Sequence, residues 1–323
     1  MNILVYGAGH MGSLYAALLK EAGEDVSLLA RGKHLEKIRE QGIVLEEFGS
    51  GRQTTTHVKT VASLEPEDTY DLVLVFLPRN HVEEVLPILA RNQQTPSVMF
   101  LGNNAAGAGK MVEALGQARV LLGFPGAASV AHNNTIRYFI LAKQEQPTTI
   151  GELDGSQSLR IKAISNTLRS AGFPVSICTN MDAWLKTHVA EISPTANALY
   201  MVHLDIHKLA HTREALLLML RAIREGYKVL SKIGVPITPK IHLLFQWLPK
   251  PLLLVLMRRR LEDRTASIKI GHAVGARDEM KTLADEFQKL IRKAGLNTPS
   301  IDKLYQYLDE QPEPAADSDS RVK

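Results

Sequence analysis

The sequence predicts an α/β protein, with a Rossmann-type, doubly wound parallel sheet in the N-terminal half and an all-helical domain after it. A glycine-rich turn directly follows the first apolar run of the chain. Apolar runs and helical patterns then alternate as far as residue 151, beyond which long helical periodicity replaces the strand signals. Such alternation implies parallel strands that are joined by right-handed helical crossovers.

The elements of the first half follow from local periodicity. Residues 3–6 form a short apolar run that ends at Gly7, and apolar residues then recur at helical spacing until Gly23. Further strands are expected at residues 25–30, 71–77, 97–101 and 118–122, and helices at residues 34–41, 82–91 and 110–115. The β-rich segments 136–142 and 148–151 are expected to complete the same sheet.

The second half shows helical periodicity with turn signals between the helices. Helices are expected at residues 159–171, 182–200, 212–232 and 277–294. We therefore expect a Rossmann-type domain over residues 1–170, a helical domain over 171–310, and a disordered tail over 311–323, where apolar residues are scarce.

Composition excludes several classes of protein. With 45% hydrophobic and 22% charged residues, the 323-residue chain is not a disordered or collagen-like protein. The net charge of +4 is spread along the chain, so no nucleic-acid partner is expected. A lone cysteine, Cys178, excludes an intrachain disulfide and any multi-cysteine metal site.

No export signal or membrane span is expected, so the protein is predicted to be cytoplasmic. The N-terminus lacks a basic region and runs straight into the first strand. The longest apolar stretch, residues 241–257, is interrupted by Pro249, Lys250 and Pro251, which makes it too short to span a bilayer. We expect this stretch in a domain core or in a dimer contact, which leaves a homodimer open.

The glycine-rich turn is predicted to bind a dinucleotide. Its residues, Gly7, Ala8, Gly9, His10, Met11 and Gly12, form G-x-G-x-x-G between a predicted strand and a predicted helix. The first glycine allows the tight turn, the second lets the pyrophosphate approach the backbone, and the third lets helix and strand pack closely. The alternative is a tight turn without a ligand.

The end of the second strand indicates which dinucleotide binds. An acidic residue about 20 positions after the glycines would accept hydrogen bonds from the ribose of NAD. Arg31 stands there instead, with Lys33 nearby, and a guanidinium attracts the 2′-phosphate of NADP. NADPH is therefore the expected cofactor, the alternative being that Arg31 is only a solvated loop charge.

A family resemblance is carried by several segments. The opening MNILVYGAGHMGSLYAALLKEAGEDVSLLARGKHLEKIREQGI resembles the start of the ketopantoate reductase (2-dehydropantoate 2-reductase) family. The resemblance extends more weakly to about residue 305, through residues 101–103, 149–151, 184–186 and 295–299. It implies a Rossmann domain with a helical domain after it, and NADPH-dependent reduction of a 2-keto acid to a 2-hydroxy acid in pantothenate biosynthesis.

The resemblance also implies roles for individual residues. Lys186 matches the lysine that polarises the keto oxygen and donates a proton, and Glu279 matches the carboxylate that meets the substrate hydroxyl. Asn103 matches an asparagine near the nicotinamide and the substrate, and Ser267 falls where the family has a serine for the substrate carboxylate.

The sequence departs from the family pattern at the substrate site. Ala190 and Pro194 stand in place of two asparagines, with Ser193 and Asn197 as local substitutes for substrate binding. Pro78 occupies the position of a family lysine, and the adjacent Arg79 is expected to replace it in contacting the cofactor or the substrate carboxylate. Asn104 stands where the family has glycine.

The residues also support this chemistry without the resemblance. Hydride transfer to a carbonyl builds negative charge on oxygen, so the site needs a proton donor or a cation. Lys186 lies among largely apolar neighbours and shares one helix face with residues 190, 193 and 197. The alternative is a surface lysine whose stem covers a core helix. His203, His207 and His211 recur at four-residue spacing on a predicted helix, and two histidines at this spacing can hold zinc. The sequence shows no pattern that would supply the remaining ligand and no H-E-x-x-H motif, so no metal is expected.

The expected function is NADPH-dependent reduction of a small 2-keto acid, without nucleic acid or membrane as a partner. Ala190 and Pro194 leave the substrate open, since a less polar site would admit another 2-keto acid or an imine. An opine-type or imine reductase is therefore the alternative enzyme. The alternative outside enzymes is an NADPH-binding sensor that has lost catalysis.

Overall fold

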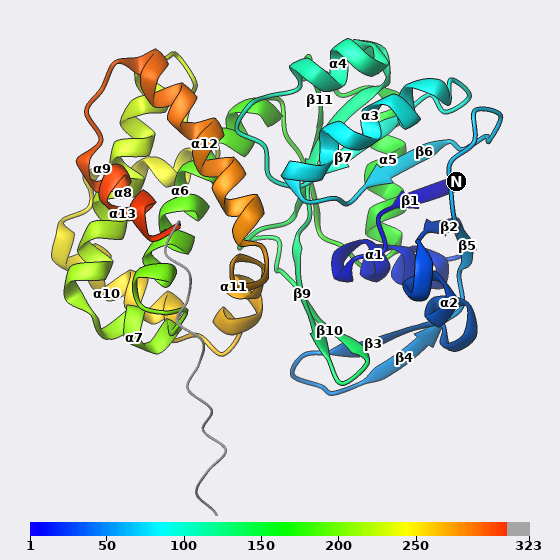
Figure 1. Cartoon of the computed structure of the whole chain (residues 1–323), viewed down its shortest axis with the longest axis horizontal. Coiled ribbons are helices and arrows are strands. Elements are labelled where there is room, and N and C mark those ends of the chain that lie inside the picture. The colour runs from blue at the N-terminus through cyan, green and yellow to red at the C-terminus, as the bar shows by residue number, and fades with distance from the viewer. Residues whose placement is uncertain (309–323) are drawn as a thin grey trace, which may run out of the picture.

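The computed structural model describes residues 1–308, and within them the backbone but not the side chains of residues 270–274. The tail expected from residue 311 lies outside the described residues. A sheet domain that contains the N-terminus stands beside a helical domain, and helix α12 (Arg277–Ala294) lies on the side of the helical domain that faces the sheet (Figure 1). The two-part fold predicted from the sequence is confirmed.

The main sheet has eight strands in the order β12-β11-β8-β7-β6-β1-β2-β5. The strands are β1 (Asn2–Tyr6), β2 (Asp25–Leu29), β5 (Lys59–Val61), β6 (Leu72–Val75), β7 (Val98–Leu101), β8 (Val120–Phe124), β11 (Thr148–Glu152) and β12 (Val175–Ile177). All neighbours are parallel except β8 and β11. Because strand order reverses between β1 and β6, the carboxyl ends of these strands form the crevice in which such sheets bind ligands.

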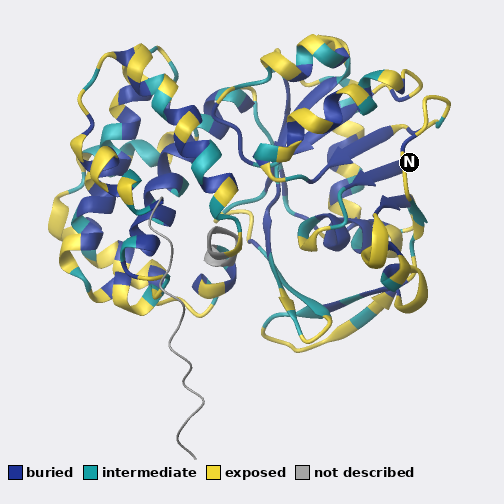
Figure 2. Cartoon of the chain, viewed as in Figure 1, coloured by how far each residue is buried: buried dark blue, intermediate teal, exposed yellow. Residues whose placement is uncertain are grey.

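Helices cover both faces of this sheet and enclose one apolar core on each face. Helices α1 (His10–Glu21), α2 (Gly32–Gln41) and α5 (Leu159–Ser170) contribute to one core, and α3 (Val82–Arg91) and α4 (Gly109–Leu115) contribute to the other. The central strands β1, β6, β7 and β8 are almost entirely buried (Figure 2). Their near-continuous apolar sequences are typical of parallel strands that are covered on both faces.

A second sheet corrects one expectation. Residues 136–142 do not complete the main sheet, because β10 (Thr135–Ile140) belongs to a separate four-stranded sheet with β9 (Ala127–His132), β3 (Ile43–Glu47) and β4 (Gln53–Thr56). Asn133 and Asn134 both adopt positive φ and close a two-residue hairpin between β9 and β10. The hairpin carries β10 away from β11 to pair with β3.

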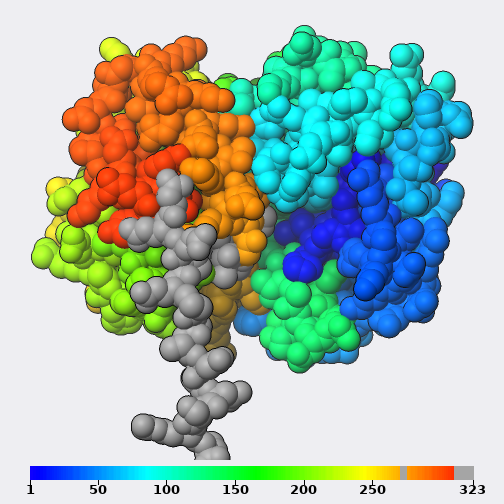
Figure 3. Space-filling view, in the orientation of Figure 1, coloured from blue at the N-terminus to red at the C-terminus, as the bar shows by residue number. Residues whose placement is uncertain are grey.

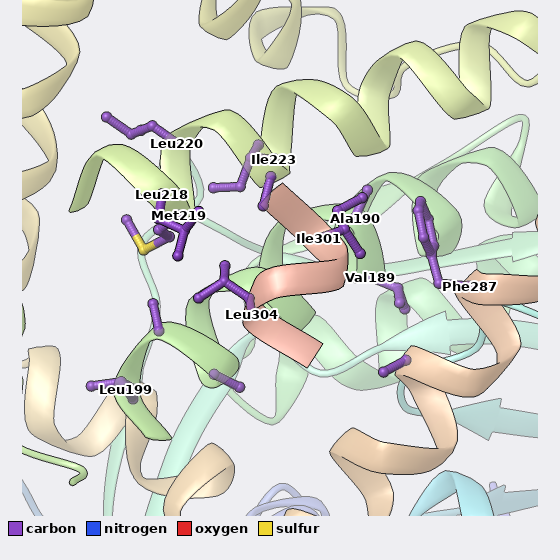
Figure 4. Close-up of a cluster of buried hydrophobic side chains, with 14 of the residues drawn as sticks. Val189, Ala190, Leu199, Leu218, Met219, Leu220, Ile223, Phe287, Ile301 and Leu304 are labelled. Carbon is purple, nitrogen blue, oxygen red and sulfur yellow. The ribbon is translucent and has the colours of Figure 1, made fainter. Parts of the chain in front are cut away.

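Ten helical segments follow in the described part of the chain. They are α6 (Met181–Met201), α7 (Ile206–His211), α8 (Arg213–Lys232), η3 (Lys240–Leu243), α9 (Leu244–Trp247), α10 (Lys250–Leu261), α11 (Ala266–Gly275), α12, α13 (Pro299–Tyr305) and η4 (Gln306–Leu308). Figure 4 shows side chains of α6, α8, α12 and α13 meeting in the core of this domain. Strand β12 pairs with β11, so the sheet domain continues beyond the boundary expected at residue 170.

Helix α6 contributes to two cores. Its first turns place Met181, Trp184 and Leu185 in the core on one face of the main sheet. From Val189 onward its buried side chains belong to the core of the helical domain. The side chain of Asn180 caps the helix by accepting a hydrogen bond from the backbone of Ala183, at 2.9 Å. One continuous helix therefore connects the two domains.

The backbone of the helical domain bears on two expectations, the helix with three histidines and the apolar stretch 241–257. The helix predicted to carry three histidines is interrupted, because His203 and Leu204 adopt positive φ before α7 begins. Among the residues that the structure describes, no group of three or more His, Cys, Asp or Glu side chains is placed to hold a metal ion. The apolar stretch 241–257 turns at Pro249, and no described helix is long and apolar enough to cross a membrane.

Candidate active site

The glycine turn after β1 has the geometry that a bound pyrophosphate requires. Gly7 adopts a φ of +115°, and a Cβ on Gly12 would lie 1.9 Å from the carbonyl oxygen of Gly7, so neither position accepts a side chain. A Cβ on Gly9 would meet no atom within 4 Å, which leaves open space at the N-terminus of α1. Figure 3 shows the blue N-terminal segment recessed in a hollow between cyan and green segments. Free backbone N–H groups at such a helix end favour a phosphate.

Arg31 and Lys33 lie exposed just after β2, the strand beside β1. Arg31 is the residue immediately before α2, and its Nη2 lies 3.4 Å from the hydroxyl oxygen of Tyr6. A ring nitrogen of His34 in the first turn of α2 lies 2.6 Å from the carbonyl oxygen of Ala8. Arg31 and Lys33 therefore lie at the same sheet edge as the glycine turn, where their positive charges could contact the phosphates of a dinucleotide.

Lys186 lies on α6 at the junction of the domains. Its Nζ donates a hydrogen bond to Oδ2 of Asp182, one helical turn earlier, at 2.5 Å. The lysine side chain is 13% exposed, whereas that of Asp182 is 45% exposed. A Cβ on Gly107 would lie 3.8 Å from the Nζ, which places the lysine beside the loop that follows β7.

Asn103 and Glu279 meet across the domain junction, although 176 positions separate them in the sequence. The side-chain amide of Asn103 donates to Oε1 of Glu279 at 3.3 Å, and the backbone N–H of Arg79 donates to the same oxygen at 3.2 Å. Both side chains are buried. The carbonyl oxygen of the Asn103 side chain is buried without a hydrogen-bond partner, so it is available to a bound ligand.

Arg79 begins the short helix η1 (Arg79–His81) after β6, and its side chain is 5% exposed. Its Nη2 lies 2.7 Å from Oε1 of Glu286 on α12. Glu286 was not among the site residues predicted from the sequence. A signal was present, because Glu286 lies next to Phe287 on the apolar face of α12 and two turns after Glu279, where an acidic residue needs a buried partner. Contact of Arg79 with the cofactor or the substrate stays a prediction.

The remaining predicted site residues lie elsewhere on the helical domain. Ser193 and Asn197 are buried and line a cavity of about 10 Å³ between α6, α12 and α13, with room for about one water molecule. Ala190 lines the same cavity and faces α8, because a Cβ added to Gly226 would lie 3.1 Å from the Cβ of Ala190. Ser267 lies exposed on α11. The roles of Ser193, Asn197 and Ser267 in substrate binding stay predictions.

Comparison with known proteins agrees with this geometry. Residues 3–155 match the family model for ketopantoate reductase PanE/ApbA. The chain is 25% identical over 253 residues to the 2-dehydropantoate 2-reductase of Pyrococcus abyssi, covering 77% of this chain and 80% of that protein. It is 27% identical over 237 residues to the 2-dehydropantoate 2-reductase of Archaeoglobus fulgidus, covering 72% and 75%.

Solved structures share the fold over almost the whole chain. The 2-dehydropantoate 2-reductase from Geobacter metallireducens superimposes with a TM-score of 0.78 at 18% identity, over 96% of this chain and 99% of that one. The ternary structure of D-mandelate dehydrogenase with NADH and anilino(oxo)acetate gives a TM-score of 0.75 at 16% identity, over 95% and 97%. Residues 3–155 therefore match the ketopantoate reductase family, and the chain shares its two-domain fold with these solved structures.

Proposed function

We propose that the protein reduces a 2-keto acid to the 2-hydroxy acid with NADPH, and that Lys186 donates the proton. The match of residues 3–155 to the ketopantoate reductase family supports the reaction class. One observation carries the assignment of residues. The loop after β7 brings Asn103 against Glu279 at one end and Gly107 beside Lys186 at the other, so three predicted site residues converge on one short segment.

NADPH is the proposed cofactor because the cations at the end of β2 suit its 2′-phosphate. Arg31 and Lys33 are both exposed at the edge where the glycine turn lies, and an acidic residue that would repel the phosphate is missing from this position. The D-mandelate dehydrogenase of the same fold was solved with NADH, so the fold itself does not choose between the two cofactors.

The chemistry proposed for the site follows from the positions of its side chains. A bound reduced nicotinamide would supply the hydride for the keto carbon. Lys186 then donates a proton from Nζ to the keto oxygen, where negative charge develops. Asp182 holds the ammonium group on the side of α6 that faces the β7 loop. Glu279, fixed by Asn103 and by the backbone of Arg79, is placed to accept the hydrogen bond of the product hydroxyl.

The identity of the substrate depends on the helical domain. Ala190 occupies a family asparagine position and packs towards Gly226, so it offers no polar group to a substrate. This observation favours testing imines, formed from a keto acid and an amine, beside simple 2-keto acids.

The test is the oxidation of NADPH followed at 340 nm with a panel of 2-keto acids, each with and without amines, together with NADPH binding measured by calorimetry. Turnover with keto acids alone supports the proposal. Turnover that requires an amine would replace it with an imine reductase. Tight NADPH binding without any turnover would indicate a cofactor sensor instead.

A further inference from the structure

We infer that Glu286 is a positioning residue for the proposed reduction, because it fixes the loop that carries Asn103 from the helical domain. The inference rests on the proposed function for its catalytic consequence, whereas the contacts that define it involve Glu286, Arg79, Ala105 and Ala106 alone. Because Glu286 contacts the loop backbone and Arg79, we assign it a role that acts through the loop.

Both carboxylate oxygens of Glu286 are used. Oε2 accepts hydrogen bonds from the backbone N–H groups of Ala105 and Ala106, each at 3.1 Å. Oε1 pairs with the guanidinium of Arg79 at 2.7 Å. Both charged side chains are less than a tenth exposed, so their charges are compensated by each other and by the two N–H donors.

Glu286 satisfies the backbone N–H groups of the two central loop residues, of which Ala105 also packs into the core of the helical domain. Ala105 and Ala106 carry only methyl side chains. On either side, Asn103 donates to Glu279, and Asn104 exchanges hydrogen bonds with Gly107 at 2.9 and 3.0 Å. Glu286 therefore anchors the middle of a turn whose two ends lie at Glu279 and at Lys186.

Glu279 and Glu286 act on the sheet domain as a pair. They lie seven residues apart, which is close to two helical turns, so both project from the same face of α12. Glu279 accepts from the backbone N–H of Arg79, and Glu286 holds the guanidinium of the same residue. The two carboxylates thus hold the loops after β6 and after β7 together at the carboxyl edge of the sheet.

The test compares Glu286→Gln with Glu83→Gln in the full-length protein. Glu83 is a matched control because its carboxylate also lies near the Arg79 guanidinium, at 3.6 Å, but is 44% exposed and pairs with Lys110. Hydrogen exchange read by mass spectrometry is expected to rise about tenfold in the peptide containing residues 103–107 for Glu286→Gln, with little change for Glu83→Gln.

The catalytic readout is the separation of kcat from cofactor affinity. Loss of loop placement is expected to lower kcat for Glu286→Gln about tenfold or more, while the Kd for NADPH stays within about twofold, because the glycine turn is not held by Glu286. A kcat within about twofold of the unaltered protein would overturn the inference, even if exchange rises. Unchanged exchange in the loop would overturn it as well.

A second variant covers the case in which Glu286→Gln leaves the buried arginine unpaired and fails to fold. The double substitution Arg79→Met with Glu286→Gln removes both charges, and the same rise in loop exchange is expected from it. Hydrogen exchange in the loop can be measured in a protein that catalyses no reaction. An unaltered protein that reduces no 2-keto acid would therefore refute the proposed function, while the anchoring of the loop by Glu286 would still be tested.

Discussion

Replacing Lys186 with methionine tests the proposed proton donor while keeping most of the side-chain volume. The Nζ and its charge are lost, whereas the stem, which makes the side chain 87% buried, is retained in the main. The freed carboxylate of Asp182 is 45% exposed and remains hydrated, so the loss of this pair should cost no more than about 1 kcal/mol of folding free energy. General acid catalysis contributes about 10² to 10⁴ in rate, equivalent to about 2.7 to 5.5 kcal/mol of barrier.

The structure therefore predicts a large loss of turnover with little loss of stability. The assay is NADPH oxidation at 340 nm with the best 2-keto acid from the panel, combined with urea unfolding of both proteins. Lys110→Met is the matched control, because this lysine is 65% exposed and pairs with Glu83 on the neighbouring helix. A loss of kcat under about threefold for Lys186→Met would refute the role of the lysine as proton donor.

Three further predictions concern the cofactor site and the helical domain. Arg31→Ala should raise the Kd for NADPH at least about tenfold and leave that for NADH nearly unchanged in calorimetry, because only NADPH carries the 2′-phosphate; equal effects would contradict it. Gly12→Ala should abolish binding of both cofactors, since its Cβ would lie 1.9 Å from a backbone oxygen, whereas Gly9→Ala, whose Cβ meets open space, should fold normally. Burial opposes ionisation of Glu191, but Arg260, 2.8 Å away, and His242 outweigh it and hold the pKa of that carboxyl well below its usual range. This stabilisation is complete above the ordinary pKa of 4.5 and is lost progressively below it, so Glu191→Gln should destabilise the protein by about 1 to 2 kcal/mol at neutral pH and less at about pH 3; a pH-independent difference in urea unfolding would contradict it.

Much of the fold could be predicted because its signals are local. The glycine turn, the apolar strands and the helical periodicity each lie within a few consecutive residues, and the structure has them where they were expected. The second sheet could not be predicted in the same way. Its central pairing joins Leu45 to Ile136, and strand partners so far apart in sequence leave no local periodic signal.

The candidate site likewise contains residues that could be predicted from the sequence and contacts that could not. The roles of Lys186, Asn103 and Glu279 were expected from the family resemblance, and the structure brings Asn103 and Glu279 into contact. Arg79 was expected to face a ligand, and no local pattern pairs it with Glu286, more than 200 positions away. Such a partnership depends on how α12 docks against the sheet, which is a tertiary property.

The sharing of α6 between two cores restricts how the two domains can move relative to each other. Because Met181, Trp184 and Leu185 are packed under the sheet while the rest of the helix lies in the other domain, α6 is a rigid connection with no flexible linker. A rotation of one domain against the other would have to bend α6 or withdraw its buried side chains from one of the two cores, and α12 packs on α6 in the core of the helical domain. Lys186 lies between the two sets of buried side chains, so α6 holds it at a fixed place relative to both domains.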